Sequence, residues 1–191
     1  MKASPVLAAL LTFTLGLAAR GAAQGQPRRG FWLAFGAGYS SLASSCDGCG
    51  SLSSQSGIAG QFRMGTTLRP NLLVGLDLES WNKSEGGKWA RSANFTAAAY
   101  WYPSTSNGFY VKGGAGLSTV SGTVGGYAID GTGFGLTGGL GYDLRLTKGF
   151  FLTPVATYFW GSVGDISTGS IVVSKGWKQS VLNLGLDATL P

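Results

Sequence analysis

Residues 57–81 read GIAGQFRMGTTLRPNLLVGLDLESW, and this stretch decides the fold. Most of its large apolar residues share one parity on either side of the Arg69-Pro70-Asn71 break: Ile58, Phe62, Met64 and Leu68, then Leu72, Val74, Leu76 and Leu78. Glycine, small polar residues and charges fill the positions between them. A period of two is typical of a β-strand, whose successive side chains point to opposite faces. The stretch therefore predicts two strands joined by a tight turn, each with one apolar and one polar face.

The same alternation recurs along the chain and predicts eight strands in all. Bulky apolar residues on one face, with glycine and charge on the other, fit a barrel with lipid outside and a narrow polar interior. Long polar loops are expected at 42–54, 82–91, 121–131 and 161–177. They alternate with short turns, as in outer-membrane barrels. We therefore predict an all-β, eight-stranded, antiparallel up-and-down transmembrane β-barrel in the bacterial outer membrane. Aromatics on both faces of Phe150–Trp160 leave the orientation of that strand open.

The composition agrees with a protein that contacts lipid. Charged residues make up only 12% of the 191-residue chain, whereas a soluble surface usually carries roughly 25–35%. No single run is apolar enough for a membrane helix, and a closed barrel resolves this conflict because it satisfies its backbone groups between strands. Outer-membrane lipids are thus expected partners. The net charge is +6, but the basic residues are scattered, so we expect no nucleic-acid partner.

The N-terminal residues have the pattern of a secretory signal peptide. Lys2 supplies a positive charge, Val6–Ala19 is mostly apolar, and Gly21-Ala22-Ala23 offers small residues for cleavage. The apolar part is shorter than the ~20 residues of a membrane-spanning helix. An uncleaved interfacial helix is the alternative. We expect residues 1–23 to be the signal peptide and residues 24–191 to form one barrel domain.

Seven charged residues fall on the small-residue faces of the expected strands and would point into the lumen. They are Arg63, Asp77, Glu79, Lys112, Asp143, Arg145 and Asp187. An eight-stranded barrel is just wide enough for side chains to fill it. Charges enclosed there must pair, because an isolated buried ion is very costly. We expect Arg63 to pair with Asp77 or Glu79 across a hairpin, and the whole set to form a plug. A narrow ion or proton path through a rearranging network is the alternative.

Two short motifs carry no catalytic or metal chemistry by our interpretation. Cys46-Asp-Gly-Cys49 lies in an expected loop of an exported chain, where a local disulfide is favoured. Two cysteines without histidine fall short of the four ligands of a zinc site. Gly133–Gly138 matches a dinucleotide-binding pattern, but it lies within a strand with no helix after it. We expect no metal and no cofactor.

The chain contains no histidine. This excludes catalysis that uses histidine as general base or as its orienting group. Ser and Asp are plentiful, but no other base stands out. We therefore expect a protein that is not an enzyme.

The eight-strand pattern, the glycine-rich inner face and the segment KGFFLTPVATYFWG (residues 148–161) resemble the small outer-membrane β-barrel family of the OmpA transmembrane-domain and OmpX type. The resemblance covers residues 24–191 and implies the barrel-assembly machinery as a partner during biogenesis. One departure is the C-terminus, Thr189-Leu190-Pro191, where the family usually has an aromatic residue.

Taken together, these features predict a structural or surface-interacting scaffold with a plugged polar lumen. Its four extracellular loops would be the place for an extracellular protein or another surface ligand to bind. A low-conductance ion channel is one alternative. A secreted lipocalin-like carrier of small molecules is another, and it would need an apolar interior and a polar exterior.

Overall fold

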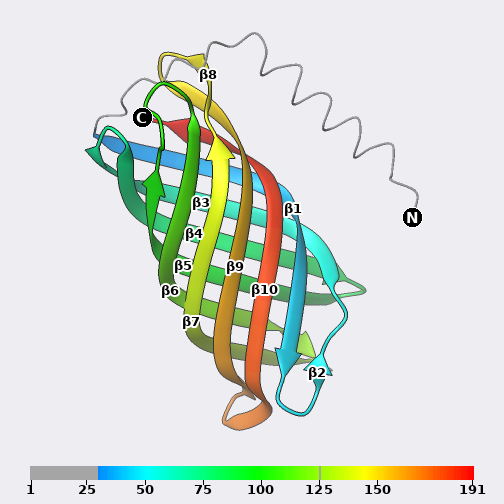
Figure 1. Ribbon diagram of the computed structural model, residues 1–191. Coiled ribbons are helices and arrows are strands. Elements are labelled where there is room, and N and C mark those ends of the chain that lie inside the picture. Colours follow the sequence, from blue (N-terminus) through cyan, green and yellow to red (C-terminus); the bar gives the residue numbers. More distant parts are fainter. Residues whose placement is uncertain (1–29, 125) are drawn as a thin grey trace, which may run out of the picture.

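Eight long antiparallel strands close into a barrel in the computed structural model, which describes residues 30–124 and 126–191 (Figure 1). The long strands are β1 (Phe31–Cys46), β3 (Gln55–Arg69), β4 (Leu72–Glu85), β5 (Lys88–Trp101), β6 (Phe109–Val124), β7 (Tyr127–Tyr142), β9 (Phe150–Thr168) and β10 (Ile171–Leu190). Two short strands, β2 (Gly50–Ser51) and β8 (Leu144–Thr147), pair with β1 and β9. Each long strand pairs with the next, and β10 pairs back with β1. The predicted fold class is confirmed. The expected signal peptide lies outside the described residues.

The alternation sorts side chains between the two faces of the wall as predicted. Phe35 is 52% exposed on the outside, whereas its neighbour Ala34 is 3% exposed inside. The open case, β9, is now settled: Phe151 and Phe159 are buried inside, and Tyr158 points outward. In the described part of the chain, no helix is long and apolar enough to cross a membrane.

The expectation of long loops at the end of the barrel opposite the termini is wrong for 82–91, 121–131 and 161–177, and the loop expected at 42–54 is shorter than predicted. β4 and β5 meet at a turn of two residues, Gly86 and Gly87, whose φ angles are +56° and +75°. β9 and β10 likewise meet at Gly169-Ser170, and β6 continues to Val124. Among the described residues at this end, the longer connection is 47–54, which includes β2. Ser, Thr and Gly in these segments suggested loops, but a strand exposed to water also accepts polar side chains.

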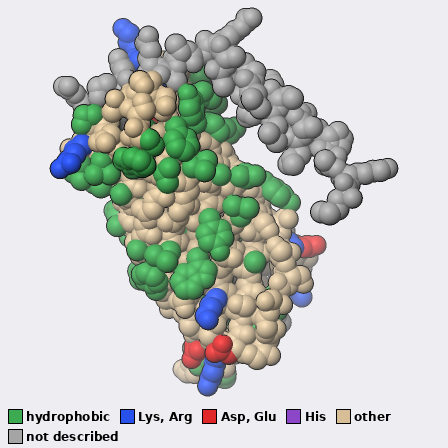
Figure 2. Space-filling model, viewed as in Figure 1, with side chains coloured by type: hydrophobic (Ala, Val, Ile, Leu, Met, Phe, Trp, Pro, Cys, Tyr) green, Lys and Arg blue, Asp and Glu red, His purple; other side chains and the backbone are tan. Residues whose placement is uncertain are grey.

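The polarity of the wall reverses along the barrel axis. Nearer the termini, the outward side chains are apolar and form a band that lipid can cover. Toward the four hairpin turns they become polar, and we call the exposed members of this set the polar sleeve: Asn82, Arg91, Asp130, Thr132 and Lys178. On the face drawn in Figure 2, hydrophobic side chains gather over the half of the barrel nearer the termini and extend to its middle, and most charges lie toward the ends. The strands have 14 to 20 residues, more than the ~9–11 that cross a bilayer. The hairpin end therefore projects beyond the membrane.

Candidate functional site: the charged lumen

Five charged side chains meet in the middle of the lumen. Strand alternation turns Arg63 of β3, Asp77 and Glu79 of β4, Lys112 of β6 and Asp187 of β10 inward, and each is at most 3% exposed. They come from four strands that lie around the barrel rather than from one hairpin. The site therefore exists only when the barrel is closed.

Lys112 binds both carboxylates of β4. Its Nζ donates to Asp77 Oδ2 at 2.8 Å and to Glu79 Oε1 at 2.6 Å. The Tyr100 hydroxyl donates to the other oxygen of Asp77, and Thr137 Oγ1 donates to Glu79 Oε2 at 2.7 Å. Both carboxylates are thus fully engaged in the lumen, which is what makes buried charge tolerable.

Arg63 finds a partner that the sequence did not suggest. Its Nη1 lies 2.7 Å from Asp187 Oδ2, and its Nη2 lies 3.8 Å from Glu79 Oε1. Asp77 is the Cα partner of Arg63 in the β3–β4 ladder, yet Asp77 is bound by Lys112 instead. Asp187 can reach Arg63 because Gly36 of the intervening β1 has no side chain, and a Cβ there would collide with the Asp187 carboxylate. The expectation of an Arg63–Asp77 pair is corrected; the longer Arg63–Glu79 contact is present.

Asp143 and Arg145 lie apart from these five residues. Asp143 accepts hydrogen bonds from the Tyr102 hydroxyl at 2.8 Å and from Thr153 Oγ1 at 2.7 Å. Arg145 does not lie in the lumen network: it is only half-buried, and its Nε donates to the Thr147 carbonyl at 3.2 Å. The reason is that β8 pairs with β9 alone, so the wall is not closed around Arg145.

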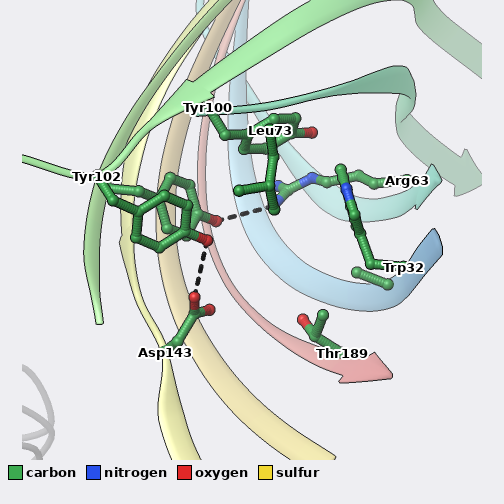
Figure 3. A pocket seen from close by; sticks show the side chains of 9 residues that line it. Trp32, Arg63, Leu73, Tyr100, Tyr102, Asp143 and Thr189 are labelled. Atoms are coloured by element: carbon green, nitrogen blue, oxygen red, sulfur yellow. Dashed lines mark hydrogen bonds between the residues drawn. The ribbon is translucent and has the colours of Figure 1, made fainter. Parts of the chain in front are cut away.

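An aromatic layer closes the lumen at the end near the termini. Ring centroids lie 5.1 Å apart for Trp32 and Tyr100, 5.6 Å for Tyr100 and Tyr110, and 5.3 Å for Tyr102 and Tyr110. Figure 3 shows Trp32, Tyr100 and Tyr102 with Arg63, and Tyr102 is directed at Asp143. The gap left among them is about 10 Å³, roughly the space of one water molecule. The inward parity of Trp32 was a signal for this layer that sequence reasoning did not use.

Apolar side chains close the lumen at the hairpin end. Trp81, Phe159 and Val181 form one buried cluster against Leu42. A second cluster consists of Val120, Val163 and Ile166, with Ile129 and Trp177 packed against it. The lumen was expected to be polar throughout, so this layer corrects that expectation. Where the outside of the barrel turns polar, its inside turns apolar, as in a water-soluble barrel.

The glycine motif 133–138 and the Cys46–Cys49 motif both have structural roles. Gly135 lies in β7, where a Cβ would come within 3.0 Å of Asn94 Nδ2. The inner glycines thus leave room for lumen side chains. Cys46 and Cys49 are joined by a disulfide at the end of β1, and the Asp47 backbone N–H donates to the Lys175 carbonyl at 2.9 Å. Within residues 30–124 and 126–191, no three His, Cys, Asp or Glu side chains gather to hold a metal ion.

Comparisons with known proteins agree with this architecture. A family model described as the outer membrane protein β-barrel domain matches residues 7–186. The fold is similar to that of Neisserial surface protein A, at 17% identity and a TM-score of 0.55, over 84% of this chain and 96% of that one. It is also similar to Ail, the attachment invasion locus protein of Yersinia pestis, at 14% identity and a TM-score of 0.57, over 85% and 100% of the two chains. No curated protein is similar enough in sequence to count as a match.

Proposed function

Because this chain belongs to the outer membrane protein β-barrel domain family, we propose that it is a closed scaffold that holds four hairpin tips at the bacterial cell surface. Its location is the outer membrane, as the family's description states. Outer-membrane lipids surround the apolar band, and the barrel-assembly machinery inserts the chain. A surface ligand reaches the protein at the hairpin tips.

The observation that carries this proposal is the contact of Lys112 with Asp77 and Glu79 in the closed lumen. All three side chains are between 0% and 4% exposed. A water-filled pore would leave such groups hydrated and free to meet permeating ions. Here they bind each other, and an aromatic layer and an apolar layer lie on either side of them. This arrangement supports a plug.

The low-conductance channel remains the second candidate, on one specific observation. Contacts run without interruption from Asp77 through Lys112, Glu79 and Arg63 to Asp187. Exchange of partners along this chain could pass a charge across the middle of the membrane. An ion would still have to pass Phe159 and Val181, which are 1% and 0% exposed. The apolar layer therefore favours the scaffold.

A lipocalin-like carrier and an enzyme agree less well with the structure than the scaffold does. The lipocalin-like carrier needs an apolar interior and a polar exterior, and the membrane part of this barrel has the reverse. We further propose that the protein is not an enzyme. The chain has no histidine, and the central carboxylates are held by Lys112 and Arg63.

Labelling of intact cells tests the surface role. Single cysteines replace Ser170 in the β9–β10 turn or Asn71 in the β3–β4 turn, with Cys46 and Cys49 changed to Ser. Both positions are exposed, but they lie at opposite ends of the barrel. A membrane-impermeant maleimide should label Ser170→Cys on intact cells and Asn71→Cys only after lysis. The reverse pattern would contradict the proposal.

A further inference from the structure

The hairpin end of the barrel carries exposed apolar side chains that the membrane around the barrel cannot cover. They are Leu52, Trp89, Tyr127, Ile171, Val172 and Val173, between 41% and 70% exposed, and we call them the apolar tips. Each of the four hairpins at this end contributes at least one. The polar sleeve separates them from the lipid-facing band. Exposed apolar groups bordered by polar residues mark interaction sites.

The β9–β10 hairpin carries three of the apolar tips, Ile171, Val172 and Val173. Pairing of β1 with β10 begins at Ser45 and Lys178, so in the described chain residues 171–177 of β10 pair in the sheet with β9 alone. Beyond this point the Asp47 backbone N–H, just after β1, donates to the Lys175 carbonyl. This hairpin lies at the end of the barrel opposite the C-terminus (Figure 1). Its β9 arm still pairs with β7 at Ser167, but Ile171, Val172 and Val173 beside the turn are 46–67% exposed.

Three consecutive apolar residues on this hairpin favour a fluid partner over a rigid one. Ile171 and Val172 are neighbours in a strand and point to opposite faces, Val173 lies at an irregularity of the β9–β10 pairing, and all three are exposed. A rigid protein surface covers one face of a hairpin. A lipid interface surrounds it and covers both.

The residue types of the other apolar tips, and the balance of charges around them, also favour a lipid interface with little net charge. Trp89 and Tyr127 are residue types that favour membrane–water interfaces. The described charges near the hairpin turns are nearly balanced: Lys83, Lys88, Arg91, Lys175 and Lys178 against Asp47, Glu85, Asp130 and Asp165. Lys83 and Glu85 also pair with each other at 3.0 Å. Such a surface has little attraction for a polyanion.

We propose that the apolar tips insert into the interface of a second membrane, one made of zwitterionic phospholipid without net charge and lying opposite the bacterial surface. The protein would thereby dock its cell to that membrane. This inference rests on the proposed surface scaffold and names its partner. Affinity should come from the apolar area that enters the interface, so it should persist at high salt.

Co-flotation with vesicles tests the proposal directly. The full chain is placed in phosphatidylcholine nanodiscs, which leave both barrel ends open, and is mixed with phosphatidylcholine vesicles. We expect the wild type to float with the vesicles while empty nanodiscs do not. Changing Ile171, Val172 and Val173 together to Ser should weaken binding at least about tenfold, given the apolar area removed. Leu146→Ser is the matched control, because Leu146 is 58% exposed at the opposite end and its loss should change nothing.

The remaining outcomes overturn the proposal. They are a folded wild type that does not float, binding that survives the triple substitution, and binding that requires anionic lipid. A wild type that ignores lipid vesicles but binds vesicles coated with protein would assign the tips to a protein partner instead. Heat-modifiable migration on gels shows that each variant is folded. If the protein does not float with vesicles but Ser170→Cys is still labelled on intact cells, this inference is wrong and the scaffold proposal stands.

Discussion

Arg63 and Asp187 form an ion pair of 2.7 Å across an intervening strand, because Gly36 of β1 leaves the space between them open. The contact joins β3 to β10, which are the strands on either side of β1. It therefore ties the wall together at the place where the first and last strands of the chain meet.

Filling the space above Gly36 should destabilise the barrel. In Gly36→Ala the new methyl group meets the Asp187 carboxylate and the Leu186 carbonyl. Overpacking of this kind typically costs about 1–3 kcal/mol. Urea unfolding from phospholipid vesicles measures the change. Gly113→Ala is the control, since nothing lies within 4 Å of the added atom; equal stability of the two variants would refute the close approach.

Removing Arg63 should leave its carboxylate partners uncompensated. Arg63→Ala is expected to lower the free energy of unfolding by up to about 3–5 kcal/mol, with water in the lumen softening the loss. Arg63→Ala combined with Asp187→Ala should cost less than the sum of the single changes, since their coupling is removed. Strict additivity in this double-mutant cycle would mean that the two side chains do not interact.

The two outer zones should respond differently to a new charge. Leu76 faces lipid and is 43% exposed, so Leu76→Arg should cost roughly 2–4 kcal/mol near the bilayer midplane. Thr132 belongs to the polar sleeve, where Thr132→Arg should cost only ~0–1 kcal/mol. Unfolding from vesicles compares them. Similar costs at the two positions would place the membrane boundary elsewhere.

The disulfide should stabilise a tip rather than the barrel. Cys46 and Cys49 lie at the end of β1, away from the lipid band and the lumen charges. Intact mass should rise by about two daltons on reduction, as two thiols form. The reduced protein should keep its folded migration on gels. Two free thiols in freshly isolated protein would contradict the pairing.

The faces of the strands could be predicted from the sequence, whereas their ends could not. Alternation around Arg63 and Asp77 is a local signal, and it assigned both residues to the lumen. In β9 the same signal failed, because Phe159 belongs to the apolar layer and Tyr158 to the lipid side. The expected loops became strand because the sleeve reverses polarity without ending the alternation. A polar outward residue such as Asp130, within the loop expected at 121–131, therefore suggested a loop although it lies in β7.

The ion-pair partners of the lumen charges also could not be predicted from neighbouring residues in the sequence. Adjacency in a hairpin suggested Arg63 and Asp77. The observed pairs, Lys112 with Asp77 and Arg63 with Asp187, cross a third strand in each case. The Arg63–Asp187 pair depends on barrel closure and on Gly36 at the crossing, and the Lys112–Asp77 pair reaches across β5, so only the three-dimensional arrangement reveals them.

Ion conductance of the reconstituted full chain tests the closed lumen most directly. In a planar phosphatidylcholine bilayer, the wild type should show no steady open current, because paired charges and apolar side chains fill the barrel. Arg63→Ala should leak more than the wild type, since it breaks the central contacts. A steady open current in the wild type that Arg63→Ala leaves unchanged would contradict the plug and favour a pore that avoids these residues.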